Sequence, residues 1–235
     1  MKTIGIIGGM SWQSTQDYYR LINEEVARRL GGLHSADLVL VSVDFARIEQ
    51  MQQWGDWEAA GTALAEAARR TEAAGAEVLI LATNTMHKVA AAVAGAVSIP
   101  LFHIADATGR AVVATGLRTV GLLGTGYTME QDFYRGWLED NYGIVVAIPG
   151  PEDRGLINDV IFGELCLGVT NDDSRAQYLR VVDGLISDGA QGLILGCTEI
   201  GMLIGTGDCP VPVFDTTTLH AKAAVAFALG DDREI

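Results

Sequence analysis

The sequence predicts an α/β protein built from two similar halves, each with its own parallel sheet, and two observations support this prediction. Short apolar runs rich in branched residues alternate with longer helical patterns along the whole chain, which is typical of parallel βαβ units. In addition, residues 75–85 (GAEVLILATNT) have an echo at residues 189–199 (GAQGLILGCTE). Both stretches begin with Gly-Ala, continue through a Leu-Ile-Leu run and end in small polar residues. We therefore expect a duplicated unit.

The first half reads as four strands separated by helical segments. Apolar runs at 3–9, 38–45, 77–82 and 99–104 predict the strands. Helical periodicity predicts helices at 10–30, at 47–75 with Gly55 inside, and at 85–97. Helices of this length between the strands indicate parallel connections, because antiparallel hairpins need only short turns.

The second half repeats this order. A strand at 118–125, a helix at 127–143 and a strand at 144–150 follow one another before the second copy of the Gly-Ala motif. Three landmarks keep their order at a spacing of about 114 residues, and they are Thr3 with Thr119, Ala76 with Ala190, and Pro100 with Pro212. We expect an N-terminal half at 1–104 and a C-terminal half at 105–215, with the helix at 216–230 able to pack on the first half.

Composition excludes several classes of protein. Sixteen Lys and Arg against thirty Asp and Glu give a net charge of −14, so the protein would repel nucleic acid. No apolar run reaches the length of a membrane span and no signal peptide is evident, which predicts a soluble cytoplasmic protein without a membrane partner. The cysteines and histidines show neither disulfide nor metal-site spacing, so we expect no metal and no cofactor.

The repeat places Thr83 and Cys197 at equivalent positions, after the third strand of each half. Functional loops lie at the carboxyl ends of parallel strands. Two halves related by a pseudo-twofold axis, with a cleft between them, would therefore bring Thr83 and Cys197 face to face. We also expect a helix to begin after each residue, which would lower the pKa of the Cys197 thiol and offer backbone N–H groups to a carboxylate. Opposed acid and base groups could invert an α-carbon without a cofactor.

Five motifs resemble those of the aspartate/glutamate racemase family, and the match spans nearly the whole chain. They are GGMSW at 8–12, SVDF followed by Arg47, TNTMH at 83–87, GTGYTM at 124–129 and GCTEIG at 196–201. The resemblance implies a cofactor-independent isomerase of two α/β halves, an amino-acid substrate, a homodimer, and Cys197 as the second catalytic residue.

The sequence departs from the family at the first catalytic position. Many members have Cys-Asn-Thr where this chain has Thr83-Asn84-Thr85. A hydroxyl is a weaker acid and base than a thiol, so we expect inversion in both directions to be impaired. A branch of the family with this Thr/Cys pattern is described as broad-specificity or L-specific amino-acid racemases. The related arylmalonate decarboxylases use the second cysteine alone, which leaves decarboxylation open. We predict that Cys197 abstracts the α-proton and that Thr83 or a water serves the opposite face.

Several residues near these motifs are candidates for binding substrate, and each has an ordinary structural alternative. The candidates are Met10, Arg47, Gln52, Asn84, Thr85, Thr125, Thr128, Thr198 and Glu199.

Arg47 could bind a side-chain carboxylate or form a surface ion pair, and Gln52 could line the same wall or be solvated. Thr125 and Thr128 could anchor the α-carboxylate or cap a helix. Glu199 could bind an ammonium group, orient Cys197 or be a favourable carboxylate in the first turn of a helix, and its charge would oppose formation of a thiolate. We expect His87 to be a packed or capping imidazole, and Cys166 and Cys209 to be inert.

Two further functions compete with the racemase. A nucleotide-binding module is disfavoured, because neither GIIGG nor GLLGTG has the spacing of the G-x-G-x-x-G motif. A catalytically weak amino-acid binder is favoured by the hydroxyl of Thr83. The substrate side chain stays open between an acidic group, held by Arg47, and a neutral polar group such as that of homoserine.

Overall fold

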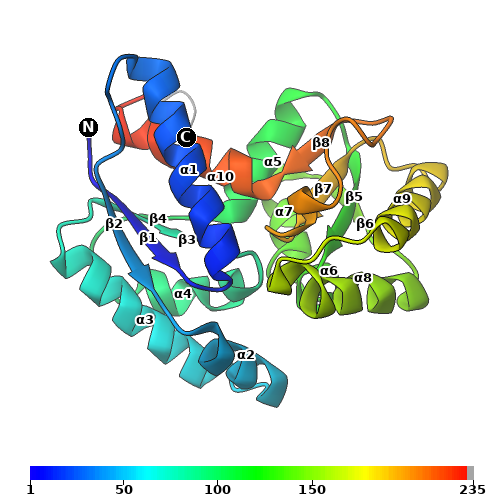
Figure 1. Cartoon of the computed structure of the whole chain (residues 1–235), viewed down its shortest axis with the longest axis horizontal. Coiled ribbons are helices and arrows are strands. Elements are labelled where there is room, and N and C mark those ends of the chain that lie inside the picture. The colour runs from blue at the N-terminus through cyan, green and yellow to red at the C-terminus, as the bar shows by residue number, and fades with distance from the viewer. Residues whose placement is uncertain (232–235) are drawn as a thin grey trace. The chain divides into compact units, whose positions relative to one another are not determined.

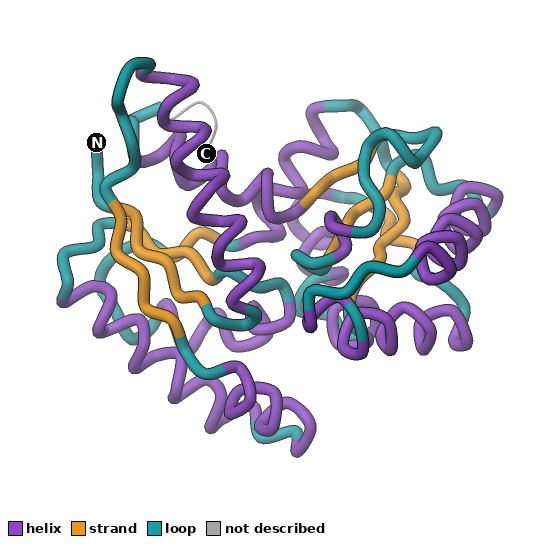
Figure 2. Tube along the Cα trace, in the orientation of Figure 1, coloured by secondary structure: helices purple, strands orange, loops and turns teal. Residues whose placement is uncertain are grey.

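The computed structural model describes residues 1–231, and their contacts divide the chain into two units. Unit 1 comprises Met1–Ile104 together with the chain from His220 onward, and unit 2 comprises Ala105–Leu219. Each unit has a four-stranded parallel sheet with helices on both sides (Figures 1 and 2). Within the described residues, no helix is long and apolar enough to cross a membrane. The predicted α/β class with two similar parallel-sheet halves is confirmed.

Unit 1 has the strand order β2-β1-β3-β4. Its elements are β1 (Ile4–Gly8), α1 (Trp12–Leu30), β2 (Leu38–Ser42), α2 (Phe45–Trp54), α3 (Trp57–Ala73), β3 (Val78–Leu81), the 3₁₀ helix η1 (Thr85–Val89), α4 (Ala90–Ala94), β4 (Leu101–Phe102) and the later part of α10 (Thr216–Ala228).

The sheet of unit 1 is covered on both faces because its central strands alternate their side chains. Ile4 and Ile6 of β1 pack with α1 and α10, whereas Ile7 packs with α2, α3 and α4. A strand buried on both faces is apolar throughout, which explains the continuous run TIGIIG. At the carboxyl end of β3, the polar residues Thr83 and Asn84 follow this apolar sheet.

Unit 2 has the matching strand order β6-β5-β7-β8. Its elements are α5 (Ile104–Ala114), β5 (Thr119–Gly124), α6 (Gly126–Glu130), α7 (Arg135–Tyr142), β6 (Val145–Ala147), α8 (Pro151–Gly163), the 3₁₀ helix η2 (Leu165–Leu167), α9 (Asp172–Ser187), β7 (Leu193–Gly196), the 3₁₀ helix η3 (Ile200–Met202), β8 (Val213–Asp215) and the start of α10.

Backbone hydrogen bonds repeat between the two sheets at the landmark residues. The N–H of Glu77 donates to Thr3 O at 2.9 Å, and Gln191 N–H donates to Thr119 O at the same distance. The carbonyl of Pro100 accepts from Leu79 N–H at 2.8 Å, as that of Pro212 does from Leu193 N–H at 2.9 Å. Ile7 is in register with Leu81, and Leu123 with Leu195. The position of Thr83 after β3 is therefore that of Cys197 after β7.

Several predicted elements are shorter than expected. Strand β2 ends at Ser42 rather than at residue 45, because Asp44 caps a helix by accepting from Ala46 N–H at 3.2 Å. The helical stretch 47–75 is two helices, because Gly55 takes a left-handed conformation with φ +70° and ends α2. The helices predicted at 85–97 and 127–143 are each broken into two shorter pieces.

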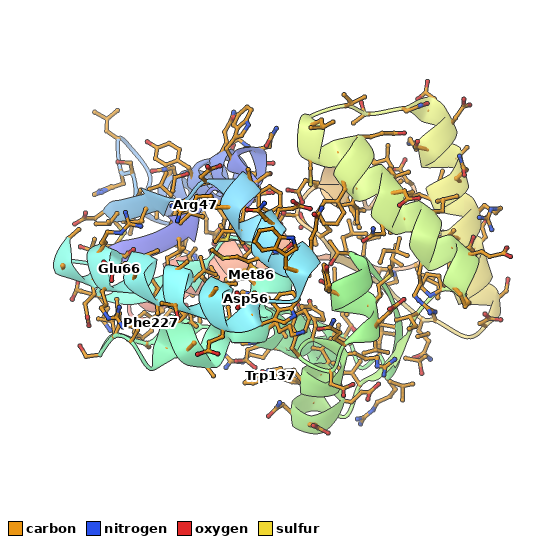
Figure 3. All side chains as sticks on the ribbon, turned by 90° about the horizontal axis from the view of Figure 1, so that it is seen from below. Arg47, Asp56, Glu66, Met86, Trp137 and Phe227 are labelled. Carbon is orange, nitrogen blue, oxygen red and sulfur yellow. The ribbon has the colours of Figure 1, made fainter. Side chains whose placement is uncertain are left out.

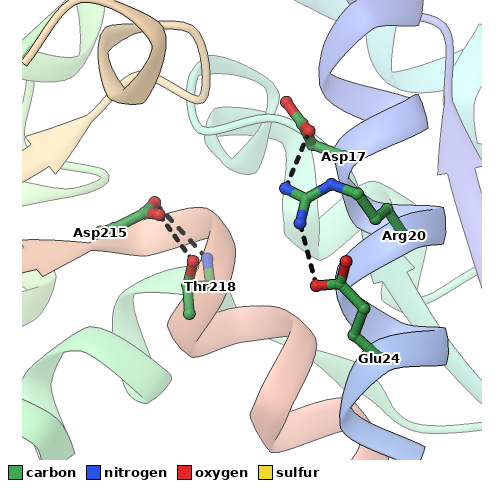
Figure 4. A network of polar contacts seen from close by, with 5 residues as sticks. All are labelled: Asp17, Arg20, Glu24, Asp215 and Thr218. Atoms are coloured by element: carbon green, nitrogen blue, oxygen red, sulfur yellow. Dashed lines mark hydrogen bonds and ion pairs between the residues drawn. The ribbon is translucent and has the colours of Figure 1, made fainter. Parts of the chain in front are cut away.

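Helix α10 begins in unit 2 and continues into unit 1. Asp215 caps its first turn by accepting from Thr217 N–H at 3.0 Å. It also accepts from the Thr218 hydroxyl at 2.6 Å, a bond drawn in Figure 4. Further along, His220 and Val225 belong to unit 1, where Val225 lies in the apolar cluster with α1. The exposed face of α1 carries the ion pairs of Arg20 drawn in the same figure, and such pairs contribute little to stability.

Candidate active site

Thr83 follows β3 in unit 1 and is 6% exposed. Its N–H donates to Leu81 O at 2.8 Å, which turns the chain sharply at the end of the strand. Its carbonyl oxygen lies 2.8 Å from Nδ1 of His87. Both backbone groups of Thr83 are thus held, which fixes the position of the hydroxyl-bearing residue.

Polar candidates cluster around Thr83 in unit 1. Asn84 and Thr85 are 3% and 7% exposed and lead into η1. Gln52 of α2 is 4% exposed, and its Nε2 donates to Met86 Sδ at 2.9 Å. A solvated Gln52 is therefore excluded. Met10 lies in the same apolar cluster as Met86, where it contributes to the core.

Arg47 lies in the first turn of α2 and is exposed. It lines a cavity of about 350 Å³ between the end of β2, α2 and α3, together with Asp44, Glu66 and Arg70. Arg47 and Glu66 are labelled in Figure 3. Within residues 1–231, Arg47 has no carboxylate within ion-pair distance, so the alternative of a surface ion pair is not observed. Its guanidinium is available to an anionic ligand.

Cys197 follows β7 in unit 2 and is 8% exposed. Its thiol donates to Glu199 Oε2 at 3.0 Å, and the Thr198 hydroxyl donates to the same oxygen at 2.7 Å. Glu199 is 3% exposed and Thr198 is 9% exposed. The three residues form one buried polar cluster in which the carboxylate orients the thiol.

The expectation of a low Cys197 pKa is wrong for this structure. Burial of the thiol and the nearby charge of Glu199 hold its pKa well above the ordinary value. The helix that was expected to lower it is absent, because residues after Glu199 form only the three-residue 3₁₀ turn η3. At rest the sulfur therefore carries its proton. Thr83 is followed by a 3₁₀ helix as well, so a strong helix dipole is missing on that side too.

Thr125 and Thr128 lie after β5 in unit 2 and cap a helix. Thr125 is the N-cap of α6 and accepts from Thr128 N–H at 3.3 Å. The two hydroxyl oxygens are 3.1 Å apart, and the residues are 5% and 0% exposed. The structural alternative, helix capping, thus applies to both. The pair is still a concentration of hydroxyl groups at the same sheet edge as Cys197.

Two features went beyond the sequence-based expectations. Cys166 was expected to be inert, and burial, followed by the charge of Glu199, raises its pKa to about 12, which agrees with an unreactive thiol and places Cys166 near the Cys197 cluster. His87 was expected to be packed, and it also holds the carbonyl of Thr83. Its spacing of four residues from Thr83 was a usable signal, because i to i+4 side-chain contacts with a backbone carbonyl are common.

The duplicated parallel fold defines the class of protein. It is similar to that of the glutamate racemase from Francisella tularensis, with a TM-score of 0.68, 17% identity and coverage of 100% of this chain and 83% of that one. At this identity the likeness concerns the fold alone.

The chain belongs to the Asp/Glu/Hydantoin racemase family, whose model matches residues 7–224. A proposed Asp/Glu racemase from Yersinia pestis is 53% identical, with a TM-score of 0.91 and coverage of 97% of this chain and 100% of that one. An aspartate racemase homologue from Pyrococcus horikoshii is 36% identical, with a TM-score of 0.83 and the same coverage. These relatives support a racemase, which is an isomerase.

Proposed function

We propose that the chain is a cofactor-independent amino-acid racemase in which Cys197 serves one face of the α-carbon and Thr83, or a water that it holds, serves the other. The observation that carries the proposal is the matched position of the two residues. Thr83 stands two residues after Leu81, and Cys197 stands two residues after Leu195, which has the equivalent register in the other sheet. A two-base racemase needs one group on each side of the substrate, and a duplicated fold supplies two such positions.

The hydrogen bond from Cys197 to Glu199 suggests how the thiol is activated. Glu199 Oε2 accepts the thiol proton, which leaves a thiolate and a neutral carboxylic acid. The thiolate then takes the α-proton from the substrate, and a carbanion remains. A hydroxyl proton from the Thr83 side adds to the opposite face and completes the inversion. The proton stored on Glu199 restores that hydroxyl through solvent, so the cycle balances without a cofactor.

The protonation state of the buried Cys197–Glu199 pair depends on whether substrate is bound. A charged carboxylate 3.0 Å from a sulfur stabilises the protonated thiol at rest, as the raised pKa indicates. An amino-acid substrate brings an ammonium group, and a positive charge near the pair would favour the thiolate. Substrate binding would therefore activate Cys197, and the free enzyme would keep a protected thiol.

The position of Arg47 favours a substrate with an acidic side chain. Its guanidinium lines the cavity in unit 1 and has no carboxylate partner there, so it could bind a distal carboxylate. The names of the relatives, which mention aspartate and glutamate, point the same way. We propose aspartate or glutamate as the first substrates to test, and homoserine as the neutral polar rival.

The test compares wild type, Cys197→Ser and Thr83→Cys by α-proton exchange in deuterated water, starting separately from each enantiomer. We expect Cys197→Ser to lose at least 100-fold in exchange from one enantiomer. Thr83→Cys should speed proton return on the other face. Cys209→Ser is the matched control, because Cys209 is half-buried outside both clusters. Equal exchange by wild type and Cys197→Ser would refute the proposal.

A single-cysteine decarboxylase is the second candidate, and the hydroxyl at Thr83 favours it. Decarboxylation needs a proton donor on one face only, which Cys197 alone can supply. Release of carbon dioxide from substituted malonates, without exchange from any amino acid, would support this function over racemisation. Calorimetric binding of an amino acid without either reaction would instead indicate a catalytically weak binder.

A further inference from the structure

The buried imidazole of His87 connects two separate backbone segments of unit 1. Its Nε2 lies 3.2 Å from the N–H of Ile104, the first residue of α5, and its Nδ1 lies 2.8 Å from the carbonyl oxygen of Thr83. The residue is 3% exposed. A backbone N–H can only donate, so Nε2 must present its lone pair. The neutral ring then carries its proton on Nδ1 and donates it to Thr83 O.

Its surroundings keep His87 neutral. Burial, followed by the neighbouring His103, holds the pKa of His87 well below its ordinary value. The ring centroid of His103 is 4.6 Å away and that of His220 is 5.8 Å away. A neutral ring with both nitrogens engaged is unsuited to carry a proton at neutral pH. Its contacts suit it to hold the backbone instead.

The held segment is the one that carries Thr83. Residues 82–84 lie between β3 and η1, outside any helix or strand. The N–H of Thr83 bonds to Leu81, so His87 supplies the side-chain bond to the remaining backbone group. Loss of this bond would leave a buried carbonyl to find a new partner, and the loop would shift.

Unit 2 lacks this arrangement. The repeat places Gly201, which is exposed, at the position of His87. There the Cys197 carbonyl accepts from Ile200 N–H at 3.2 Å within the turn itself. One proton-transfer face would thus depend on a histidine and the other would not.

We propose that His87 is a positioning residue that fixes Thr83 through its backbone carbonyl and so sets the rate of proton transfer on the Thr83 face alone. This inference rests on the proposed racemase function. His87 exchanges no proton with the substrate in this role, and it differs from the catalytic pair in acting through the chain.

The test uses two variants, each of which retains one of the two hydrogen bonds made by the imidazole. In His87→Asn, the side-chain amide lies near the place of Nδ1 and can still donate to Thr83 O. In His87→Gln, the amide reaches the place of Nε2 and can accept from Ile104 N–H, but the bond to Thr83 is lost. Exchange of the α-hydrogen in deuterated water is measured from each enantiomer, and Thr83→Val and Cys197→Ser show which enantiomer reports which face.

We expect His87→Gln to slow exchange on the Thr83 face by about ten-fold, mainly in kcat, and on the Cys197 face by less than two-fold. His87→Asn should stay within about three-fold of wild type on both faces, and the pH profile of neither variant should change. An equal loss on both faces would overturn the inference, and so would a pH profile that loses a titrating group.

A measurement on the wild-type protein keeps the inference falsifiable if His87→Gln fails to fold. Nitrogen NMR of histidine-labelled protein at pH 7 should show a neutral His87 with its proton on Nδ1. A protonated ring, or a proton on Nε2, would overturn the inference. If wild type exchanges no amino acid, the racemase proposal fails and this inference falls with it, whereas equal slowing of both faces leaves the racemase intact.

Discussion

Acid should destabilise the protein through the imidazoles of unit 1, of which His87 is buried and His103 is half-buried. Burial, followed by the neighbouring His220, lowers the pKa of His103 to about 4 from an ordinary value of 6.5. The unfolded chain binds this proton below pH 6.5, whereas the folded protein binds it only near pH 4. The stabilising contribution is therefore present above pH 6.5 and is lost as the pH falls through that window.

The size of the loss follows from this shift. Between pH 7 and pH 5, one such histidine costs about 2 kcal/mol of unfolding free energy. For a chain of this length, that corresponds to a drop of about 4–8 °C in Tm. The pKa of His87 is lowered in the same direction, so it adds to the loss. Glu25, whose pKa falls to about 2 beside Arg28, loses its contribution only below pH 4.5.

The assay is thermal unfolding followed by circular dichroism at pH 7, 6 and 5 and constant ionic strength. Wild type is compared with His103→Gln, and His34→Gln is the matched control because His34 is exposed. His103→Gln should remove about half of the loss in Tm between pH 7 and pH 5, and His34→Gln should change it little. Identical pH dependence in wild type and His103→Gln would refute the reasoning.

Three further predictions concern the sulfur, a turn and a buried hydrogen bond. Alkylation of Cys197 by iodoacetamide, followed by mass spectrometry, should be slow at pH 7 and still rise above pH 9, because the thiol pKa is raised. Gly9→Ala should lower Tm more than Gly31→Ala. Both glycines have positive φ, but only at position 9 would a Cβ clash, because it would lie 2.2 Å from a backbone oxygen. Equal losses in Tm would contradict this. Tyr18→Phe removes the hydroxyl 2.8 Å from His220 Nδ1 and should lower the free energy of unfolding, measured with denaturant, by about 1–3 kcal/mol; an unchanged value would contradict this.

The architecture could be predicted from the sequence because its signals are local and repeated. An apolar run such as EVLILA at 77–82, which lies between two helical patterns, is readily interpreted as a strand, and the Gly-Ala motif predicts the same strand in both units. The element ends were harder to predict. Phe45 continues the apolar run that starts at Leu38, yet Asp44 accepts from a backbone N–H and starts a helix there. Capping competes with strand propensity, and apolar periodicity does not show which prevails.

The chemical state of the site could not be predicted from position alone. The pattern after Cys197 resembles a helix start, but Gly201 and Gly205 follow closely, and the chain makes only a 3₁₀ turn. A thiol pKa depends on burial and on the nearest charge, which sequence order does not reveal. The adjacency of Glu199 predicted that its charge would oppose a thiolate, but that this effect outweighs a helix start became clear only with the 3.0 Å contact.

The two units share a strand order and a register, and they differ in how each holds its chemical group. Cys197 is oriented through its side chain by a carboxylate, whereas Thr83 is fixed through its carbonyl by an imidazole. A carboxylate beside a thiol can store a proton, and a neutral imidazole with both nitrogens engaged stores none. Replacing Thr83 by cysteine would therefore place a thiol at a position whose carbonyl is held by the neutral imidazole of His87, without adding a group that accepts the thiol proton. For this reason we expect Thr83→Cys to improve proton return on its own face, and to leave proton abstraction there slower than abstraction by Cys197.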